Sequence, residues 1–560
     1  MKKIAALLLM WFTGAGVFSQ SLTPLSVEKI MRDPKWIGAS PSNPEWSADG
    51  QTLYFNWNPE NAPSDSLYAV SLKNMVPQKV PAGQISDIVF SNAVAYNSAR
   101  SFYAFARRSD IYFGNFKTGV VKQITNTATS ESAPRFSFNE SKIVFLLDDN
   151  LYAWDITSGE TVQLTDFRKG LDPAVKEAGK KPNSQEEWLK TDELKLMEVL
   201  RERKEKREAD DAFKKKWLPT TVRRTIYTGD SSVHDIQISA DGRFVSYLLT
   251  KAAKDARHTI IPNYVTEDGF TEDIAGRTNV GAPLGSQKLC IYDREKDTVL
   301  GVAFNNIPGI RDIPRYVHDY PELLKKRVNE NAVREIRITK VSWAPHADYA
   351  VVDIDAIDNK DRWLMKLDGA TGGLSLLDRQ HDDAWIGGPG ISGYNTGWIN
   401  NSLFWFQSEE TGFSHLYTVD VMSRKKLALT FGKYEVLQCE LSPDKRNFFI
   451  TTNEVHPGEQ QLYRLPVTGG KAVRLTEMTG ANQTALSPDG VALSIMYSYT
   501  NQPWELYIQE SRPGKKAVQI TDRAKSETFS SYSWRDPELV KVPASDGKLM
   551  PARLYRPAKP

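Results

Sequence analysis

Cysteine is almost absent from this sequence. Only Cys290 and Cys439 occur among 560 residues, and they fall in different units of the repeat described below. Two widely separated cysteines define no disulfide framework, so we predict two buried free thiols. An excess of charge of one sign is also lacking, because the formal net charge is only +2. That balance argues against a surface dedicated to nucleic acid or another polyanion.

The common catalytic motifs are missing as well. A nucleophile elbow needs the pattern G-x-S-x-G, and no Gly-x-Ser in the chain continues in that way. The pattern H-E-x-x-H does not occur, the seven histidines show no ligand spacing, and there is no phosphate-binding glycine loop. We therefore assign no catalytic residue, no metal ligand and no cofactor to the sequence.

No hydrophobic run in the sequence is long enough to span a membrane. The N-terminus has two lysines, an apolar run from Ile4 to Trp11 and small residues up to Ser19, which is the layout of a secretory signal. We expect residues 1–19 to be a signal peptide, which predicts a periplasmic or secreted protein without membrane attachment after cleavage. The alternative is a retained N-terminal anchor.

The sequence does contain a repeat. Gln461–Thr476 reads as two strands joined by a Gly-Gly turn, and the turn Ser487–Gly490 (S-P-D-G) then leads into another strand. The first strand of this unit carries a Leu-Tyr pair or an equivalent, which recurs at Leu67–Tyr68, Ile111–Tyr112, Leu151–Tyr152, Leu289–Cys290, Leu364–Met365, Leu416–Tyr417, Leu462–Tyr463 and Leu506–Tyr507. The last strand often closes on Leu-Thr or Ile-Thr, at Thr125, Thr165, Thr430, Thr476 and Thr521.

Undisturbed copies of the unit lie roughly 40–50 residues apart, which is the period of four-stranded propeller blades. We therefore predict an all-β chain with an eight-bladed β-propeller, seven blades being the alternative. The predicted domains are a helical segment at 20–43, the propeller at 44–533 and a pair of strands of different character at 534–560.

Three helical or loop insertions are expected within the propeller, at residues 166–225, 258–281 and 305–331. The first contains a predicted helix from Ser184, as N-cap, to Trp217. Its dense mixed charge is typical of a solvated helix, and the alternative is an arm that binds a partner or makes a homodimer. The third contains a predicted helix at Pro321–Val328.

The second insertion carries the candidate binding residues. Glu267 with Asp268, and Glu272 with Asp273, form two acidic pairs on loops punctuated by glycine. Loops carry function more often than a regular scaffold does. Acidic loops over the mouth of a propeller would bind a peptide amine or a cation, and the alternative is a surface hairpin tip with solvated carboxylates.

Two stretches resemble a known family. Ser408–Asp420 (SEETGFSHLYTVD) resembles the propeller of the dipeptidyl peptidase IV branch of the prolyl oligopeptidase family of serine peptidases. The closing stretch DPELVKV…SDGKLMPARLYRP is similar to the first strands of that family's α/β-hydrolase domain. The S-P-D-G turns and Leu-Tyr units resemble the same propeller, although Tol-type and tricorn-type propellers share them.

This resemblance implies a secreted serine peptidase that cleaves short peptides, with a propeller that admits and orients the substrate. It implies that the Ser-Asp-His triad lies in a hydrolase domain whose opening strands are the last that the sequence contains, so the 560 residues should be inactive alone. The family's amine-binding Glu-Glu pair has no good match, since Glu186-Glu187-Trp188 differs in its flanks and Glu409-Glu410 belongs to the blade signature. The alternative function is a stand-alone periplasmic binding module of Tol type.

Overall fold

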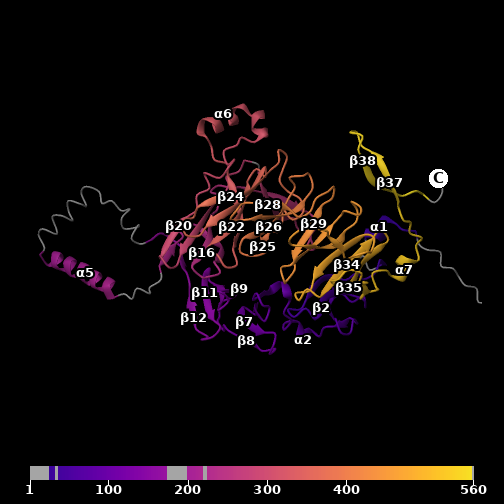
Figure 1. Cartoon of the computed structure of the whole chain (residues 1–560), viewed down its shortest axis with the longest axis horizontal. Helices are drawn as coiled ribbons and strands as arrows, with labels where there is room; N and C mark the ends of the chain where they lie inside the picture. Colours follow the sequence, from indigo (N-terminus) through magenta and orange to yellow (C-terminus); the bar gives the residue numbers. More distant parts are fainter. Residues whose placement is uncertain (1–23, 32–35, 173–197, 218–223, 280, 558–560) are drawn as a thin grey trace, which may run out of the picture.

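A computed structural model describes residues 24–31, 36–172, 198–217, 224–279 and 281–557. Eight four-stranded antiparallel sheets follow one another between Ser42 and Gln519 (Figure 1). In seven sheets the four strands are consecutive in the sequence, and the fourth sheet differs only in that a hairpin interrupts it. The predicted eight-bladed β-propeller is confirmed, and the seven-bladed alternative is wrong.

The blades follow one another along the chain. Blades 1 to 4 contain β1 (Ser42–Trp46), β2 (Thr52–Trp57), β3 (Ser66–Ser71), β4 (Gln78–Lys79); β5 (Val94–Tyr96), β6 (Phe102–Arg107), β7 (Asp110–Asn115), β8 (Val121–Gln123); β9 (Glu131–Ser137), β10 (Lys142–Leu147), β11 (Asn150–Asp155), β12 (Thr161–Gln163); β15 (Ser232–Ile238), β16 (Phe244–Lys251), β19 (Ser286–Asp293) and β20 (Thr298–Gly301). Blades 5 to 8 contain β21 (Ile336–Trp343), β22 (Tyr349–Ala356), β23 (Asp361–Asp368), β24 (Leu374–His381); β25 (Gly397–Trp398), β26 (Leu403–Ser408), β27 (His415–Asp420), β28 (Lys426–Ala428); β29 (Val436–Leu441), β30 (Asn447–Thr452), β31 (Gln461–Pro466), β32 (Val473–Arg474); β33 (Ala481–Leu486), β34 (Ala492–Tyr499), β35 (Gln502–Glu510) and β36 (Val518–Gln519).

The closing threonine of the repeat has a structural cause. All eight Leu-Tyr pairs or equivalents lie on the third strand of their blades. In five blades the threonine Oγ1 accepts the backbone N–H of the first residue of that pair at 2.8–2.9 Å, as from Leu462 to Thr476. This hydrogen bond joins the end of the short fourth strand to the third strand, just beyond the last backbone hydrogen bond between the two. Leu-Thr is therefore a feature of blade closure.

The S-x-D turn is also held by its side chains. In four blades the serine hydroxyl donates to the aspartate Oδ1 two residues later at 2.5–2.6 Å, as from Ser487 to Asp489. The same serine oxygen accepts the backbone N–H that starts the second strand, as from Ala492 at 2.9 Å. All these bonds lie within the turn and the start of the next strand, so the local sequence is enough to form them.

Hydrophobic side chains fill the spaces between neighbouring blades. Seven separate clusters of buried residues each join two adjacent blades, from blades 2 and 3 round to blades 8 and 1. Between blades 1 and 2 the contact includes the edge-to-face pair Tyr54–Phe90, and the Tyr96 hydroxyl donates to the carbonyl of Ala48 at 2.9 Å. The core is therefore a ring of interfaces.

Chain segments outside the blades help to close the ring between blades 8 and 1. The Ala39 N–H donates to the carbonyl of Arg523 at 2.7 Å, and the Ser526 N–H donates to the carbonyl of Ile37 at 2.6 Å. The short helix α7 (Glu527–Ser530) places Phe529 against Trp36, with ring centroids 6.0 Å apart. The helix predicted before blade 1 is α1 (Val27–Met31), and none of its residues is buried: Val27, Ile30 and Met31 are all exposed.

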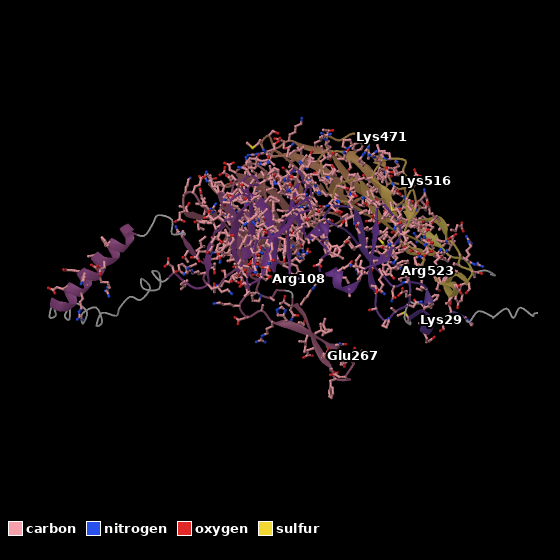
Figure 2. All side chains as sticks on the ribbon, turned by 90° about the horizontal axis from the view of Figure 1, so that it is seen from below. Lys29, Arg108, Glu267, Lys471, Lys516 and Arg523 are labelled. Atoms are coloured by element: carbon pink, nitrogen blue, oxygen red, sulfur yellow. The ribbon has the colours of Figure 1, made fainter. Side chains whose placement is uncertain are left out.

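All the insertions leave the propeller on one side. Because neighbouring strands are antiparallel, the link from strand two to strand three and the link to the next blade emerge on the same face, which we term the connection face. The S-x-D turns lie on the other, the turn face. Figure 2 shows Lys471 and Lys516, on turn-face loops, at one edge and Glu267 projecting from the opposite side.

The first insertion starts and ends in a parallel pair of strands, β13 (Asp166–Arg168) and β14 (Thr225–Tyr227). Its helix is confirmed as α5 (Glu198–Trp217), which stands apart from the blades in Figure 1, while the predicted N-cap Ser184 lies outside the described residues. Side chains 202–210 are all exposed, in agreement with a solvated helix.

The other segments outside the blades complete the chain. The link from blade 1 to blade 2 contains α2 (Ala82–Ile85) and the 3₁₀ turn η2 (Ser91–Ala93). The third insertion contains the 3₁₀ turn η3 (Arg315–Asp319) and the predicted helix, α6 (Pro321–Glu330). After blade 8 the chain forms a separate hairpin of β37 (Glu538–Pro543) and β38 (Leu549–Leu554).

Both cysteines are buried and unpaired, as predicted. Among the described residues, no helix is long and apolar enough to cross a membrane, and no group of three or more His, Cys, Asp or Glu side chains is arranged to hold a metal ion.

Candidate functional site

The four acidic residues predicted from the sequence lie on one projecting hairpin. Strands β17 (His258–Asn263) and β18 (Glu272–Thr278) pair antiparallel between the second and third strands of blade 4. We call residues 258–278 the arm. Glu267 and Asp268 occupy the tip, which agrees with the predicted alternative of a surface hairpin tip. The placement of the second pair on a loop is wrong, because Glu272 and Asp273 belong to β18.

All four carboxylates of the arm are exposed. The Asp268 carboxylate accepts the backbone N–H of Phe270 at 2.9 Å, and that hydrogen bond lowers the pKa of Asp268. The arm also carries exposed apolar side chains: Ile260, Ile261, Tyr264, Val265, Phe270 and Ile274. β-branched and aromatic residues explain the hairpin, since they favour strands even where no core covers them. The arm thus combines acidic tips with an apolar surface.

A second acidic group forms where three connection loops of blades 5 to 7 meet. Asp382 follows β24, Glu409 follows β26, and Glu435 precedes β29. We call these three residues the blade-6 acidic site. The Glu435 carboxylate accepts the backbone N–H of Ser414 at 2.5 Å, and the Asp382 carboxylate accepts that of Trp385 at 2.9 Å. Two of the three carboxylates are therefore held by backbone donors.

Glu409 differs from its neighbours. Its side chain is half-buried and has neither an ion pair nor a hydrogen bond within the described part of the chain. Burial, and then repulsion from Glu435 and Asp382, raise the pKa of the Glu409 carboxyl. An acid in that situation gains from a cation placed beside it, because the cation removes the repulsion and supplies hydrogen bonds. Glu409 is therefore the group at this site that is ready to accept a ligand.

The adjacent Glu410 has the opposite environment. Lys426 bridges the Glu410 and Asp378 carboxylates at 2.5 and 2.8 Å, so the charge of Glu410 is already compensated. The sequence assigned Glu409 and Glu410 together to the blade signature. The structure separates them, with Glu410 in a structural ion pair and Glu409 facing the neighbouring connection loop.

A glycine makes room for Glu409. Gly388 has φ of +97°, and a Cβ added there would lie 2.1 Å from the Glu409 Oε1. The loop before Gly388 also presents Trp385, whose side chain is 69% exposed. An exposed indole beside an acidic group is a surface on which a peptide side chain and an ammonium group can both be held.

Sequence reasoning missed this site because its three acids are far apart in the chain. Nothing local to Asp382 or Glu435 indicates that they lie near Glu409. The available signal was the blade register: all three residues lie on links that the repeat assigns to one face. The structure brings these three together and leaves the arm's four acids in a separate group.

The protein is thus an eight-bladed β-propeller whose blades follow one another in sequence order, and its connection face carries two groups of carboxylates. Residues 324–504 match the family model for the dipeptidyl peptidase IV (DPP IV) N-terminal region, and this range includes the signature Ser408–Asp420. The resemblance predicted from the sequence is confirmed over these residues, which include blades 5 to 7.

Solved structures agree on the fold. The crystal structure of Porphyromonas gingivalis dipeptidyl peptidase 4 matches with a TM-score of 0.53 and 14% identity, over 95% of this chain and 67% of that one. A putative dipeptidyl aminopeptidase IV from Bacteroides ovatus matches with a TM-score of 0.52 and 13% identity, over 93% of this chain and 65% of that one. The chain thus spans about two thirds of the length of each structure.

Proposed function

We propose that this chain is the substrate-gating propeller of a secreted serine peptidase of the prolyl oligopeptidase family, DPP IV-like branch, which cleaves short peptides. The observation that carries the proposal is the family match over residues 324–504. In this proposal the propeller binds the substrate and contributes no catalytic group, because the sequence contains no nucleophile elbow. The nucleophile and its partners then belong to an α/β-hydrolase domain outside these 560 residues.

The C-terminal hairpin supports a contact with such a domain. Residues 534–560, in this proposal, are the opening strands of the hydrolase. The hairpin leaves six apolar side chains more than a third exposed: Leu539, Val542, Leu549, Met550, Leu554 and Tyr555. Its strands pair only with each other among the described residues, and the Arg553 guanidinium lies 5.9 Å from the ring of Tyr499 in blade 8. Six exposed apolar side chains on one hairpin are typical of a face that another domain covers.

The blade-6 acidic site gives the propeller a role in substrate binding. We propose that Glu409 binds the free amino group of a peptide substrate, and that Trp385 packs on its first side chains. The arm residues Glu267, Asp268, Glu272 and Asp273 would take part in substrate entry. Secretion through residues 1–19 and a homodimer that uses α5 are further parts of the proposal.

The first experiment compares a free and a blocked peptide amine. Isothermal titration calorimetry would measure binding of Ala-Pro amide and of N-acetyl-Ala-Pro amide to the chain at pH 7. We expect the free amine to bind at least tenfold more tightly, a difference of about 1.4 kcal/mol. The Glu409→Gln variant should lose that preference. The matched control is Glu160→Gln, an exposed acid on a turn-face loop, which should keep it.

Two results would contradict the role of Glu409: equal binding of both peptides to the unmodified chain, or an unchanged preference in Glu409→Gln. If the double variant Glu267→Gln, Glu272→Gln loses the preference instead, the arm is the amine site. In a complete enzyme the arm variant should raise KM, and an unchanged KM would refute the arm's role in entry.

The family proposal has its own test. The intact mass of the native protein from its source cells should exceed the calculated 63.1 kDa by roughly a domain of 200–250 residues. A species near or below 63.1 kDa would instead favour the stand-alone binding module of Tol type.

A further inference from the structure

A cavity lies at the centre of the propeller on its turn face. Its volume is about 500 Å³, and blades 2, 3, 4, 5 and 7 all contribute to its wall. The lining includes the first strands or S-x-D-type turns of these blades, among them Arg100, Arg135, Ala240, Pro345 and Lys445. Because turns from opposite sides of the ring line the same space, the cavity lies on the propeller axis.

Arg135 enters this cavity without a counter-ion. Its Nη1 donates to the Gln237 side-chain oxygen at 2.9 Å and its Nη2 to the carbonyl of Ile236 at 2.7 Å, and both acceptors are neutral. Its Nε is buried and has no partner. No carboxylate oxygen among the described residues lies within 4.0 Å of this guanidinium, and burial lowers its pKa to about 10.

Asp235, the acid that attracts Arg135, has another hydrogen-bond partner. Asp235 lies on the same strand as Gln237, and its Oδ1 accepts the Gln237 side-chain N–H at 2.8 Å. Gln237 therefore stands between the aspartate and the arginine and contacts both. The attraction of Asp235 reaches Arg135 only at longer range.

Arg100, from the neighbouring blade 2, repeats this arrangement in the lining of the same cavity. Its Nη1 donates to the backbone carbonyl of Pro488 in blade 8, and its guanidinium lies 4.4 Å from the centre of the Tyr96 ring. It makes no ion pair within the described part of the chain, although Asp489 and Glu440 attract it from farther away. Burial lowers the pKa of Arg100 as well.

The remaining charges leave the cavity positive. Lys445 adds a third cation to the lining. Of the described residues that line the cavity, Glu140 alone is acidic, and its carboxylate accepts the Ser98 N–H at 2.6 Å and the Ser98 hydroxyl at 3.1 Å. Partly burying two guanidinium groups without a paired anion is costly, since each loses hydration and gains only neutral acceptors. An anion in the cavity would offset that cost.

We propose that this cavity is a binding site for an oxyanion group, carried by a small molecule or a peptide, and held by Arg100 and Arg135. Guanidinium groups suit planar carboxylates and phosphates because they donate two parallel hydrogen bonds. The volume accommodates a small organic anion as well as inorganic phosphate. The site is separate from the connection face, and the inference does not rest on the peptidase proposal.

The test uses the full chain and three probes: inorganic phosphate, the dipeptide Gly-Pro, and Gly-Pro amide, which lacks the carboxylate. Differential scanning fluorimetry and calorimetry would be run against sodium chloride of matched ionic strength. We expect phosphate or Gly-Pro to raise Tm with saturation, as for a ligand that binds only the folded state. Gly-Pro binding without amide binding identifies a carboxylate site, and phosphate binding alone identifies a site for inorganic anions or phosphate esters.

Variants locate the effect. Arg135→Gln and Arg100→Gln should each weaken binding of the active probe at least tenfold. Arg108→Gln is the matched control, because Arg108 is an exposed arginine on a connection-face turn, beside Asp87 (Figure 2). It should bind like the unmodified chain. In chloride alone Arg135→Gln should fold with an unchanged or higher Tm, since it removes a half-buried charge that has no counter-ion. If Arg135→Gln does not fold, the binding result for Arg100→Gln decides between the outcomes.

The proposal is overturned if no probe raises Tm beyond the chloride control. It is also overturned if the folded arginine variants bind the active probe as tightly as the unmodified chain and the Arg108 control do.

Discussion

Replacing Thr476 with valine tests whether the Leu-Thr ending stabilises the blades through its hydroxyl. The Thr476 side chain is 1% exposed, its Oγ1 accepts the Leu462 N–H at 2.8 Å, and its hydroxyl donates to the Gln461 side-chain oxygen at 2.8 Å. Valine keeps the shape of the side chain and removes both hydrogen bonds. The buried Leu462 N–H is then left without an acceptor.

The expected cost follows from that unsatisfied group. Leaving one buried donor unpaired destabilises a protein by about 1–3 kcal/mol, and the lost bond to Gln461 adds roughly 1 kcal/mol. We therefore expect Thr476→Val to lower the free energy of unfolding of the region around blade 7 by about 2–4 kcal/mol. The matched control is Thr157→Val on an exposed turn, which should change it by less than about 0.5 kcal/mol.

Two measurements check this prediction. A urea titration followed by tryptophan fluorescence reports the overall loss of stability, and amide hydrogen exchange reports the Leu462 N–H itself. Exchange at Leu462 should accelerate in the variant while amides in blade 3 keep their rates. A change below 0.5 kcal/mol together with unaltered exchange at Leu462 would refute the reasoning and leave packing of the Leu-Tyr pair as the cause of the repeat.

Three further predictions concern charge and backbone. Asp353→Asn should destabilise the chain by about 3–5 kcal/mol, because Asp353 and Arg362 form a buried ion pair with bonds of 2.8 and 2.5 Å, and thermal melts would measure it. Gly388→Ala should cost about 1 kcal/mol through its positive φ and should also weaken binding of a peptide amine, since the new Cβ displaces Glu409; unaltered calorimetric affinity would contradict this. The raised pKa of Glu409 means that ionising this side chain costs folding stability. Glu409→Gln should therefore match the unmodified chain in stability below about pH 4, and become the more stable of the two as pH rises through the Glu409 pKa. Parallel curves of Tm against pH for the two proteins would exclude this.

The propeller was predictable because its signals are local. Each Leu-Tyr pair, S-x-D turn and closing threonine lies within one blade, and their hydrogen bonds join residues at most about fifteen positions apart, as Thr476 and Leu462 are. The buried state of both cysteines followed from their place in strands of that repeat. Even the helix α6 was indicated by its own sequence.

The elements that sequence reasoning missed depend on distant partners or on the absence of a core. For residues 258–281 a surface hairpin tip was predicted as the alternative, but its long strands were not, because the β-branched residues around Ile260 and Ile274 form strands that nothing described covers. The helix α1 shows an apolar pattern that remains exposed. The environment of Glu409 is set by Asp382 and Glu435, and its charge balance depends on how three links converge at one face.

The ring has one junction between neighbouring blades that no backbone link crosses. Every blade is built from one continuous stretch of chain, so the backbone joins each pair of neighbours except blades 8 and 1. There the ring relies on a hydrophobic cluster and on the hydrogen bonds of Ala39 and Ser526. A force applied to the two ends of the propeller would load this junction directly, and the first rupture in a single-molecule pulling trace should be its opening, before any blade unravels.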